Sequence, residues 1–466
     1  MSENFDVVVI GAGPAGYVAA IRAAQLKQKV AIVDKQWLGG VCLNVGCIPS
    51  KSLLRNAELA HILRERGKDF GFSMENLKLD YSVAVKRSRQ NSDRLTKGVG
   101  FLMKKNGIAV FMGSAKLTKP NLVTVTDKDG KATELSAKNI IVATGASAAA
   151  PAAWKIDGEK VVTYWEAILQ EKLPKSVVVI GSGAIGVEFS TVWSSYGVGV
   201  TIVEMLPRLV PLEDEEVSKE LEKEFKKRGI KFMTGHKVES VEATATGVKV
   251  MVSADGKTTA LEADQALVAI GFRPNSKGLG LEEVGVKISE RGFVEINEKM
   301  QTSVPNIYAI GDVTGKLMLA HVGSAMGIVA AETIAGAETV TLDYEMMPRA
   351  TYCQPQIASF GLTEAQAKER GYTVKIGRFP FQPNGKALGI GDYAGFVKLV
   401  IDEKYGEILG AHMIGPEVTE LLPELTLAQM MELTPHEIAR NVHAHPTLSE
   451  AIMEAAHGAE GSAIHI

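Results

Sequence analysis

The sequence predicts an α/β fold: two similar parallel-sheet domains followed by a C-terminal domain of α+β type. One phrase, an apolar strand followed by a glycine-rich turn and a helix, occurs twice, as VVVIGAGPAG at 7–16 and VVVIGSGAIG at 177–186. In both copies a second apolar strand ends in an acidic residue, Asp34 or Glu204, at the same spacing. Toward the C-terminus the pattern changes to hairpin-like strands, FVKLVIDEKYGEILGAHMIG at 396–415, and then to helices. Alternating strands and helices are typical of parallel sheets, whereas strands followed by helices indicate an α+β domain.

The composition excludes several classes of protein. With 466 residues the chain has room for several domains. Its 51 Lys and Arg residues are balanced by 54 Asp and Glu residues, so the formal charge of −3 attracts neither nucleic acid nor an anionic membrane. The N-terminal MSENFDVVVIG does not resemble a secretory signal, no apolar run is long enough to span a bilayer, and three cysteines are too few for a disulfide scaffold. We therefore expect a cytoplasmic protein without nucleic-acid or membrane partners.

Both glycine-rich turns have the spacing G-x-G-x-x-G, which suits a dinucleotide. The first glycine permits a tight turn, the second lets the backbone approach a pyrophosphate, and the third lets the helix pack on the strand. The helix N-terminus then faces the phosphates, and the acidic residue accepts hydrogen bonds from ribose hydroxyls. Glu204 would repel a 2′-phosphate, which favours NAD over NADP. The glycines are Gly11, Gly13 and Gly16 in the first copy and Gly181, Gly183 and Gly186 in the second.

Two dinucleotides on one chain indicate FAD together with NAD. The alternative is that both copies are structural βαβ units with incidental glycines, but then the strand context and the acid must recur by chance. Two short strands that end in small residues, in NIIVATGA and NIYAIGDV, lie on either side of the second copy, so the FAD domain is expected to be split by the NAD domain. The predicted division is 1–147 and 275–345 for the FAD domain, 148–274 for the NAD domain and 346–466 for the third domain.

A cysteine pair directly follows the first nucleotide-binding unit. In GGVCLNVGCIPSKSLL, Cys42 and Cys47 have the spacing C-x4-C. The residues after Cys47 have helical character, so this thiol is expected at a helix N-terminus, where the helix dipole favours a thiolate. Such a thiol beside a flavin can pass electrons to it. The alternatives are a structural pair of buried thiols or half of a metal site, but a zinc site needs two more ligands and only His61 is close in sequence. We expect no metal.

The C-terminal segment NVHAHPTLSEAIMEAAHG contains a candidate general base. Pro446 suits the first turn of a helix, so His445 would lie at the non-helical entry and could fold back toward Glu450. A carboxylate that holds one ring nitrogen fixes the tautomer and leaves the other nitrogen to move a proton to or from a thiol. The alternative is a capping histidine with a first-turn glutamate favoured by the helix dipole. His443 is the poorer candidate because Pro446 is not adjacent to it.

Three further residues carry a weaker signal. Lys51 lies one helical turn beyond Cys47, where it is either a cation that stabilises an anionic reduced flavin or a solvated helix lysine. Glu188 follows Gly186, where the helix dipole favours an acid in any case. Cys353, in TYCQPQIASFG, has no partner at a useful spacing, so we expect a buried or interface residue of apolar character.

Taken together, these motifs identify a family. Along essentially its whole length the chain resembles the dihydrolipoyl dehydrogenases, within the pyridine nucleotide–disulfide oxidoreductases. The motifs that carry the resemblance are GGVCLNVGCIPSK, GSGAIGVE, YAIGDV, LAHVGSAMG and HAHPTLSE. Their conjunction is highly specific. The resemblance implies a homodimeric flavoprotein that binds FAD and NAD, with the third domain as its dimerisation domain.

The resemblance also implies roles for the candidate residues. Cys42 would be the thiol that exchanges with the substrate disulfide, and Cys47 the thiol in contact with the flavin. His445, oriented by Glu450, would be the general base and would act on the disulfide of the other subunit. The implied reaction oxidises protein-bound dihydrolipoamide: the substrate dithiol reduces the Cys42–Cys47 disulfide, His445 takes up the thiol protons, and the electrons pass through FAD to NAD+.

The implied cofactor contacts are spread over the first three segments. Lys51 and Glu188 would pair near the flavin, on the side where nicotinamide docks. The FAD contacts would be Gly11, Gly13, Gly16, Asp34, Lys51, Ala115, Thr144, Gly145, Asp312, Ala320 and His321, the last through its backbone. The NAD contacts would be Gly181, Gly183, Gly186, Glu188, Glu204, Val238 and Gly271. The family usually has glutamate at the position of Asp34, so this shorter acid would reach the ribose by a small shift of the strand end.

The implied partners carry lipoyl groups. They are the lipoyl-bearing proteins of 2-oxo acid dehydrogenase complexes or the H protein of the glycine cleavage system. Related enzymes fit less well: a glutathione reductase should have alanine at the position of Gly186, a mercuric reductase should have a cysteine pair where this chain ends GAEGSAIHI, and a soluble transhydrogenase would lack Cys42. A non-catalytic, NADH-responsive docking subunit is the alternative from another class, but it has no need of Cys42, Cys47 and His445.

Overall fold

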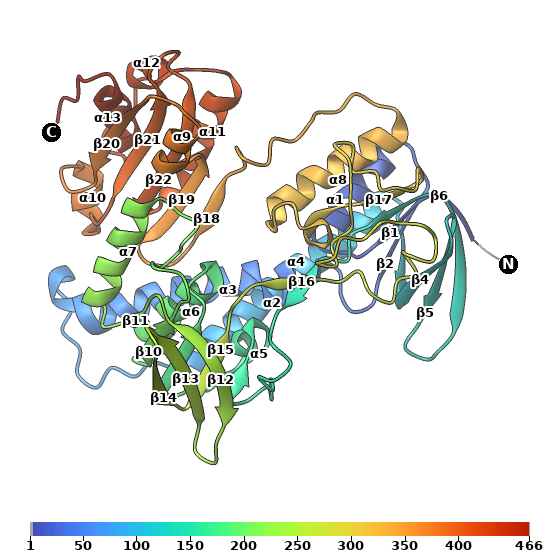
Figure 1. The fold of residues 1–466 in the computed structure, drawn as a ribbon, viewed down its shortest axis with the longest axis horizontal. Helices are drawn as coiled ribbons and strands as arrows, with labels where there is room; N and C mark the ends of the chain where they lie inside the picture. Colours follow the sequence, from blue (N-terminus) through green and yellow to red (C-terminus); the bar gives the residue numbers. More distant parts are fainter. Residues whose placement is uncertain (1–2, 466) are drawn as a thin grey trace. The chain divides into compact units, whose positions relative to one another are not determined.

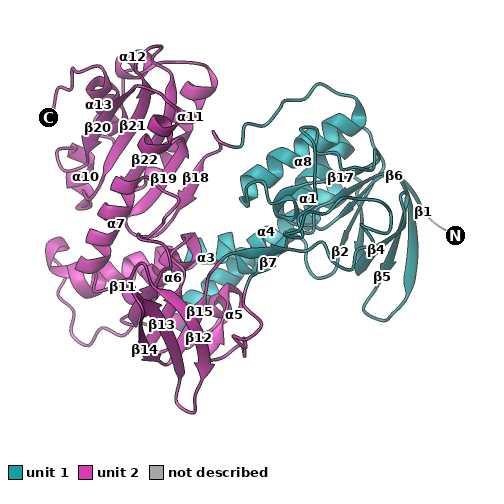
Figure 2. Cartoon of the chain, viewed as in Figure 1, with its two compact units in different colours: residues 1–52, 82–149, 271–344 teal, residues 53–81, 150–270, 345–466 magenta. Residues whose placement is uncertain are grey.

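The structure is a computed structural model that describes residues 3–465. The chain divides into two compact units (Figure 2). The first unit consists of residues 1–52, 82–149 and 271–344, and the second of residues 53–81, 150–270 and 345–466. Both units are discontinuous, because the chain leaves each of them and later returns. The division into four segments predicted from the sequence stays a prediction.

A seven-stranded sheet forms the centre of the first unit. Its order is β3-β2-β1-β6-β5-β4, and β17 pairs with β6. Its parallel part consists of β1, β2, β3, β6 and β17, whose residues form the near-continuous apolar runs that parallel sheets need because both faces are covered. The strands are β1 (Glu3–Ile10), β2 (Val30–Asp34), β3 (Ala109–Met112), β4 (Ser114–Lys119), β5 (Leu122–Thr126), β6 (Ala132–Val142) and β17 (Ile307–Ala309); a separate pair joins β7 (Ala146–Ala148) to β16 (Phe272–Pro274).

Distant parts of the chain meet in this unit. Strand β17 lies parallel to the end of β6, although the whole second glycine-rich unit separates them in the sequence. Helix α1 (Pro14–Gln25) packs along α8 (Ala320–Ala335), as Figure 1 shows. Small residues allow this close approach, since a Cβ on Gly327 would lie 2.7 Å from the carbonyl oxygen of Ala15. The first and last segments of the unit therefore form one core.

Helices after the first glycine-rich unit carry the cysteine segment. They are α2 (Gly40–Val45), α3 (Cys47–His61) and α4 (Tyr81–Lys105), with a π-helical turn η1 (Ile62–Arg66) and a 3-10 turn η2 (Gly67–Phe70) between the last two; a further 3-10 turn, η3 (Gly311–Thr314), precedes α8. Both α3 and α4 contain residues of each unit.

The second unit contains the second glycine-rich turn. A parallel sheet of order β11-β10-β9-β15-β8 is accompanied by an antiparallel sheet of order β12-β13-β14. The elements are β8 (Val161–Val162), α5 (Tyr164–Leu169), β9 (Ser176–Ile180), α6 (Ala184–Ser195), β10 (Gly199–Val203), α7 (Glu215–Lys227), β11 (Lys231–Met233), β12 (Lys237–Ala243), β13 (Val248–Ala254), β14 (Lys257–Ala263) and β15 (Gln265–Val268).

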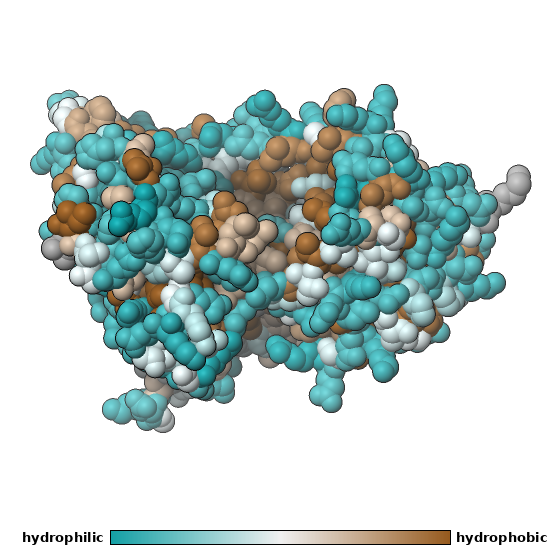
Figure 3. Space-filling model, turned by 90° about the horizontal axis from the view of Figure 1, so that it is seen from above, coloured by the Kyte–Doolittle hydropathy of each residue, from teal (hydrophilic) through white to brown (hydrophobic). Residues whose placement is uncertain are grey.

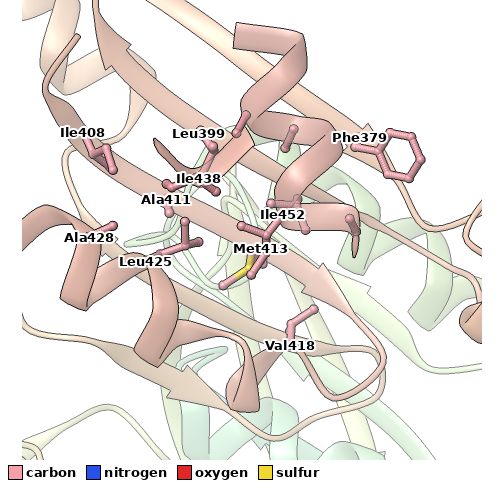
Figure 4. Close-up of a cluster of buried hydrophobic side chains, with 14 of the residues drawn as sticks. Phe379, Leu399, Ile408, Ala411, Met413, Val418, Leu425, Ala428, Ile438 and Ile452 are labelled. Carbon is pink, nitrogen blue, oxygen red and sulfur yellow. The ribbon is translucent and has the colours of Figure 1, made fainter. Parts of the chain in front are cut away.

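The rest of the second unit is an antiparallel sheet with helices. Its order is β18-β19-β22-β21-β20, and the predicted hairpin is formed by β21 and β22. Apolar residues of the two hairpin strands pack against α11, α12 and α13 in one core (Figure 4). The elements are β18 (Arg349–Thr351), β19 (Gln356–Gly361), α9 (Glu364–Glu369), β20 (Val374–Pro380), α10 (Gly385–Ile390), β21 (Phe396–Asp402), β22 (Ile408–Gly415), a 3-10 turn η4 (Val418–Glu420), α11 (Leu422–Met430), α12 (Pro435–Arg440) and α13 (Glu450–Ala459).

The predicted fold class is confirmed: two parallel-sheet nucleotide-binding folds and a C-terminal α+β domain. Hydrophilic side chains cover most of the face drawn in Figure 3, with apolar side chains in smaller groups among them. Within residues 3–465, no helix has both the length and the hydropathy needed to cross a bilayer.

A buried lysine connects α7 to the C-terminal sheet. The side chain of Lys398 on β21 is 2% exposed, and its Nζ lies 3.2 Å from Asp214, 2.7 Å from Glu216 and 2.8 Å from Glu364. Burial opposes the charge, but hydrogen bonds to Glu216 and Glu364 raise the pKa of Lys398. The ion pairs therefore contribute fully at neutral pH, and the contribution is lost only as the pH rises through the raised pKa of this lysine.

Replacing Lys398 by methionine is expected to lower the free energy of unfolding by about 3 kcal/mol, because it leaves the buried Asp214 carboxylate without its counter-charge. The measurement is the denaturant midpoint of the second unit in the full chain. Lys219→Met is the matched control, since Lys219 on α7 makes a solvent-exposed ion pair with Glu215. Equal midpoints for the two variants would contradict the prediction.

Candidate active site

The three glycines of the first glycine-rich turn have different structural roles. Gly11 has φ +107°, and a Cβ there would overlap the carbonyl oxygen of Ala143. A Cβ on Gly16 would overlap the carbonyl oxygen of Gly11, so this glycine lets α1 pack on β1. Gly13 caps α1 with φ −69°, and its Cβ would meet nothing nearer than 4.0 Å. Gly11 and Gly16 are therefore required by the fold, whereas the space over Gly13 is open to a ligand.

The second turn repeats this arrangement. Gly181 has φ +99°, and a Cβ there would overlap the carbonyl oxygen of Ala269, while a Cβ on Gly186 would overlap that of Gly181. A Cβ on Gly183, at the N-cap of α6, would meet no atom within 4 Å. The two turns thus present the same open backbone at a helix N-terminus, which suits a pyrophosphate.

The two acids also occupy equivalent positions. Asp34 is the last residue of β2, and its Oδ2 accepts the N–H of Ala12 at 2.8 Å. Glu204 comes directly after β10, and its Oε2 accepts the N–H of Ser182 at the same distance. The shorter acid at the strand end and the longer acid one residue beyond it therefore reach the same place beside the turn. The reach of Asp34 to the ribose stays a prediction.

A buried carboxylate fits the FAD prediction. Asp312, in η3, has no hydrogen-bond partner for its side chain among the described residues 3–465, and burial raises its pKa to about 6. A half-buried acid of this kind needs hydroxyl donors, which the polyol chain of a flavin nucleotide supplies. The open Gly13 and the lone Asp312 together show that the residues present fit FAD.

The other predicted FAD contacts lie in the first unit. Thr144 and Gly145 are hydrogen-bonded to Asn275, through the Thr144 hydroxyl to the Asn275 carbonyl at 2.7 Å and the Asn275 N–H to the Gly145 carbonyl at 3.0 Å. Ala320 and His321 form the first turn of α8, Ala115 lies on β4, and Lys51 on α3. The hydrogen bonds to Asn275, together with the pairing of β7 and β16, join residues 143–149 to residues 271–275.

Of the remaining predicted NAD contacts, Val238 and Glu188 belong to the second unit and Gly271 to the first. Val238 lies on β12, and Gly271 has φ +118° with open space around its Cβ position. Glu188 on α6 is 7% exposed, and its Oε1 accepts the N–H of Tyr352 at 2.9 Å. Lys51 belongs to the first unit and Glu188 to the second, so their pairing stays a prediction.

The cysteine pair lies at the junction of two helices. Cys42 is in α2, and Cys47 begins α3, as the sequence predicted. A hydrogen bond with Cys47 and burial raise the pKa of Cys42, so the two sulfurs are in contact. Cys47 is the better placed of the two to carry negative charge because it stands at the N-terminus of α3.

The loop between the two cysteines is braced from α4. Asn44 donates from Nδ2 to the carbonyl oxygens of Leu38 at 3.0 Å and Gly40 at 2.8 Å. Arg89 on α4 donates to the carbonyl oxygen of Asn44. Tyr17 was not predicted as a site residue: burial and the charges of Cys42 and Cys47 raise the pKa of its phenol. Its position in the helix after Gly13 was the only available signal.

The C-terminal candidates are separated by burial. His445 is 77% exposed, and its Nδ1 donates to Glu450 Oε1 at 2.9 Å, which leaves Nε2 open. His443 is 4% exposed, and both its ring nitrogens are engaged, Nδ1 with the Asn441 carbonyl at 2.9 Å and Nε2 with Glu424 at 2.8 Å. Only His445 can therefore exchange a proton with a substrate or a thiol.

One local expectation is wrong. Pro446 does not lie in the first turn of a helix, because α13 begins only at Glu450. The Thr447 hydroxyl donates to the Ala444 carbonyl at 2.7 Å, and the Thr447 N–H donates to Glu450 Oε2 at 2.8 Å. These bonds form a turn before the helix starts. Glu450, the first residue of α13, therefore holds the turn that contains His445.

Cys353 has the buried character that the sequence predicted. It is 0% exposed, and its thiol donates to the Pro355 carbonyl at 3.2 Å. The adjacent Tyr352 N–H binds Glu188, and the Gln354 N–H lies 3.4 Å from the Thr191 hydroxyl of α6. The segment before β19 therefore braces the helix that carries Glu188. Within residues 3–465, no group of three or more His, Cys, Asp or Glu side chains is arranged for a metal ion.

Comparison with known proteins decides the family. The sequence profile of the pyridine nucleotide-disulphide oxidoreductases matches residues 5–327, and that of the dimerisation domain of the same family matches residues 347–456. The chain belongs to the pyridine nucleotide-disulphide oxidoreductases. The predicted family is confirmed, and the C-terminal α+β domain is the dimerisation domain of this oxidoreductase.

Individual relatives refine the placement. Dihydrolipoyl dehydrogenases from Mycobacterium leprae, Corynebacterium glutamicum and Bacillus subtilis are 55%, 51% and 44% identical to this oxidoreductase, over 99%, 100% and 100% of its chain and the same shares of theirs. The solved structure of LpdA from Mycobacterium tuberculosis has a TM-score of 0.91 at 29% identity and covers 97% of this chain and 99% of that one. The resemblance to dihydrolipoyl dehydrogenases is therefore confirmed.

Proposed function

We propose that this oxidoreductase oxidises protein-bound dihydrolipoamide to lipoamide and reduces NAD+. The contact between Cys42 and Cys47 at the start of α3 carries the proposal, because a disulfide between cysteines at this place can accept two electrons from a substrate dithiol by exchange. The names of full-length relatives support the substrate class. In the reaction, dihydrolipoamide loses two electrons and two protons, and NAD+ gains two electrons and one proton, so one proton is released.

The residues of the chain divide this work. The substrate thiolate is proposed to attack the sulfur of Cys42, so that a mixed disulfide forms as the Cys42–Cys47 bond breaks. Cys47 then leaves as a thiolate, which the N-terminus of α3 stabilises. His445 takes up the substrate thiol proton at Nε2, while Glu450 holds Nδ1 and stabilises the imidazolium. When bound, FAD supplies the two-electron carrier between the dithiol and the nicotinamide.

The cofactors are proposed to be FAD at the first turn and NAD at the second. Asp34 and Asp312 would hold the FAD ribose and polyol, and Glu204 would hold the NAD ribose and disfavour a 2′-phosphate. We propose a homodimer in which His445 serves the disulfide of the partner subunit. The partners would be lipoyl-bearing proteins of 2-oxo acid dehydrogenase complexes or the glycine cleavage H protein, in the cytoplasm.

The test is an anaerobic titration of the FAD-loaded protein with dihydrolipoamide, followed by NAD+, with the visible spectrum recorded throughout. We expect a long-wavelength absorption band, which a thiolate beside oxidised flavin produces, and its loss on addition of NAD+ as NADH appears. A flavin that NADH reduces but dihydrolipoamide does not would overturn the lipoamide proposal and favour another disulfide substrate. Full binding to lipoyl complexes without any turnover would favour a docking subunit.

A valine at Gly183 is expected to raise the KM for NAD+ by at least about 100-fold, because its side chain would fill the open space where backbone should meet pyrophosphate. Dihydrolipoamide should still produce the spectral change, since Gly183 has no part in that half-reaction. The measurement is steady-state kinetics together with the anaerobic spectrum. Gly186→Val is the contrasting variant: its Cβ overlaps the Gly181 carbonyl, so it should lower folding yield instead. An unchanged KM in Gly183→Val would exclude this turn as the NAD site.

A further inference from the structure

The turn that carries His445 has little packing of its own. Between α12 and α13, the side chains of Asn441, Val442, Ala444, His445 and Pro446 are exposed, and Val442 is 92% exposed. Apolar contacts within the chain therefore do little to hold this turn. Its conformation depends on the polar contacts at its two ends.

The first end is held by His443. Its two ring nitrogens contact two acceptors, the Asn441 carbonyl and the Glu424 carboxylate, so both nitrogens must carry protons. The hydrogen bond to Glu424 raises the pKa of His443, which keeps the ring an imidazolium although it is buried. The Asn441 amide adds a bond to Glu424 at 3.3 Å. This end of the turn is thus tied to the first turn of α11.

The second end is held by Glu450. Its two oxygens accept from the His445 ring and from the Thr447 N–H. The carbonyl of Thr447 accepts in turn from Asn384, which is 4% exposed at the N-cap of α10. His445 therefore stands between two anchors, His443 two residues before it and Glu450 five residues after it.

The two anchors are also coupled by charge. The charged groups that face His443 are Glu424 from α11 and Glu450 from α13. Burial opposes ionisation of Glu450, but the Thr447 N–H, His445 and the positive charge of His443 lower its pKa. The imidazolium of His443 thus helps to keep Glu450 ionised, which is the state that can orient His445.

We propose that His443, held between Glu424 and the Asn441 carbonyl, is a positioning residue that fixes the turn 441–447 and so presents the His445–Glu450 pair to the dithiol. The proposal rests on the proposed function, in which His445 is the base. His443 itself has no nitrogen left to exchange a proton with a substrate, so it acts only through its neighbours.

The test compares His443→Gln with the wild type in the FAD-loaded dimer. We expect kcat/KM for dihydrolipoamide to fall about tenfold and the midpoint of its pH profile to move downward, since a Glu450 that is less ionised and less well placed stabilises the protonated form of His445 less. Reduction of ferricyanide by NADH, which does not need the base, should stay unchanged. Glu424→Gln should reproduce these effects. His436→Gln is the matched control, because His436 is an exposed histidine on α12 paired with Glu460.

A double-variant comparison separates positioning from general damage. If His443 acts through Glu450, adding His443→Gln to Glu450→Gln should cause little further loss, whereas independent effects would multiply. The pH dependence of iodoacetamide alkylation of the NADH-reduced dithiol gives a readout without a lipoyl substrate. The alkylation profile of His443→Gln could shift although even the wild type does not turn over dihydrolipoamide. This result would overturn the proposed substrate but keep the positioning role of His443. Unchanged profiles in both assays, or multiplied losses, would overturn the positioning role.

Discussion

Replacing either Cys42 or Cys47 by serine is expected to lower kcat/KM for dihydrolipoamide by at least about 1,000-fold, because serine cannot form the disulfide and removal of a covalent nucleophile has losses of this size or larger. Reduction of ferricyanide by NADH should persist, since the nucleotide turns are untouched. The measurement is steady-state kinetics with both acceptors.

The two cysteine variants should differ in their spectra. In Cys42→Ser the remaining Cys47 keeps its place at the N-terminus of α3, so a long-wavelength band should be present without any reductant. In Cys47→Ser the band should be absent under all conditions, because the remaining Cys42 is not the thiol proposed to lie beside the flavin. The reverse pattern would exchange the proposed roles of the two thiols. Cys353→Ala is the matched control, since this buried thiol donates to the Pro355 carbonyl and has no part in the proposed redox pair.

Replacing His445 by glutamine is expected to lower kcat/KM for dihydrolipoamide by about 100-fold to 10,000-fold, the range typical of a lost general base. Glu450→Gln should lose about tenfold, because its amide oxygen can still accept from Nδ1 but no longer stabilises the imidazolium, and tenfold corresponds to about 1.4 kcal/mol. Both variants should reduce ferricyanide with NADH normally. A loss in Glu450→Gln as large as that in His445→Gln would mean that the carboxylate contacts the reacting groups directly.

Mixed dimers test whether His445 serves the other subunit. In a dimer of one Cys42→Ser subunit and one His445→Gln subunit, one site would combine the intact dithiol with the intact base. Co-expression of the two inactive variants should then restore about a quarter of the wild-type turnover, as expected for random pairing of two subunits in a symmetric dimer. Without such restoration, the base and the dithiol would belong to the same chain.

The nucleotide turns could be predicted in detail because their requirements are local. Gly11 and Gly181 adopt positive φ, and Gly16 and Gly186 meet backbone only five residues away, so a short stretch of sequence contains most of the constraint. The start of α3 at Cys47 is local for the same reason. The fold class followed from these repeats and from the hairpin pattern that became β21 and β22.

Other features depended on partners that are distant in sequence. The choice between His443 and His445 is one example. Glu424, which is distant in sequence, binds the buried side chain of His443, whereas the side chain of His445 is exposed. The bond from the Tyr352 N–H to Glu188 joins residues far apart in the chain, and nothing near either of them signals it. The late start of α13 was not predicted. The Thr447 hydroxyl bonds to the Ala444 carbonyl and Glu450 accepts the Thr447 N–H, so a turn forms where a helix was expected.

The sequence by itself determined the two nucleotide-binding turns, the cysteine pair at a helix start and the family, because backbone conformation and helix position are set by neighbouring residues. Only the tertiary structure decided which histidine has a free nitrogen, which thiol keeps its proton and what holds Glu188. Burial and hydrogen-bond partners come from packing between segments, and the spacing of residues along one chain does not contain that information.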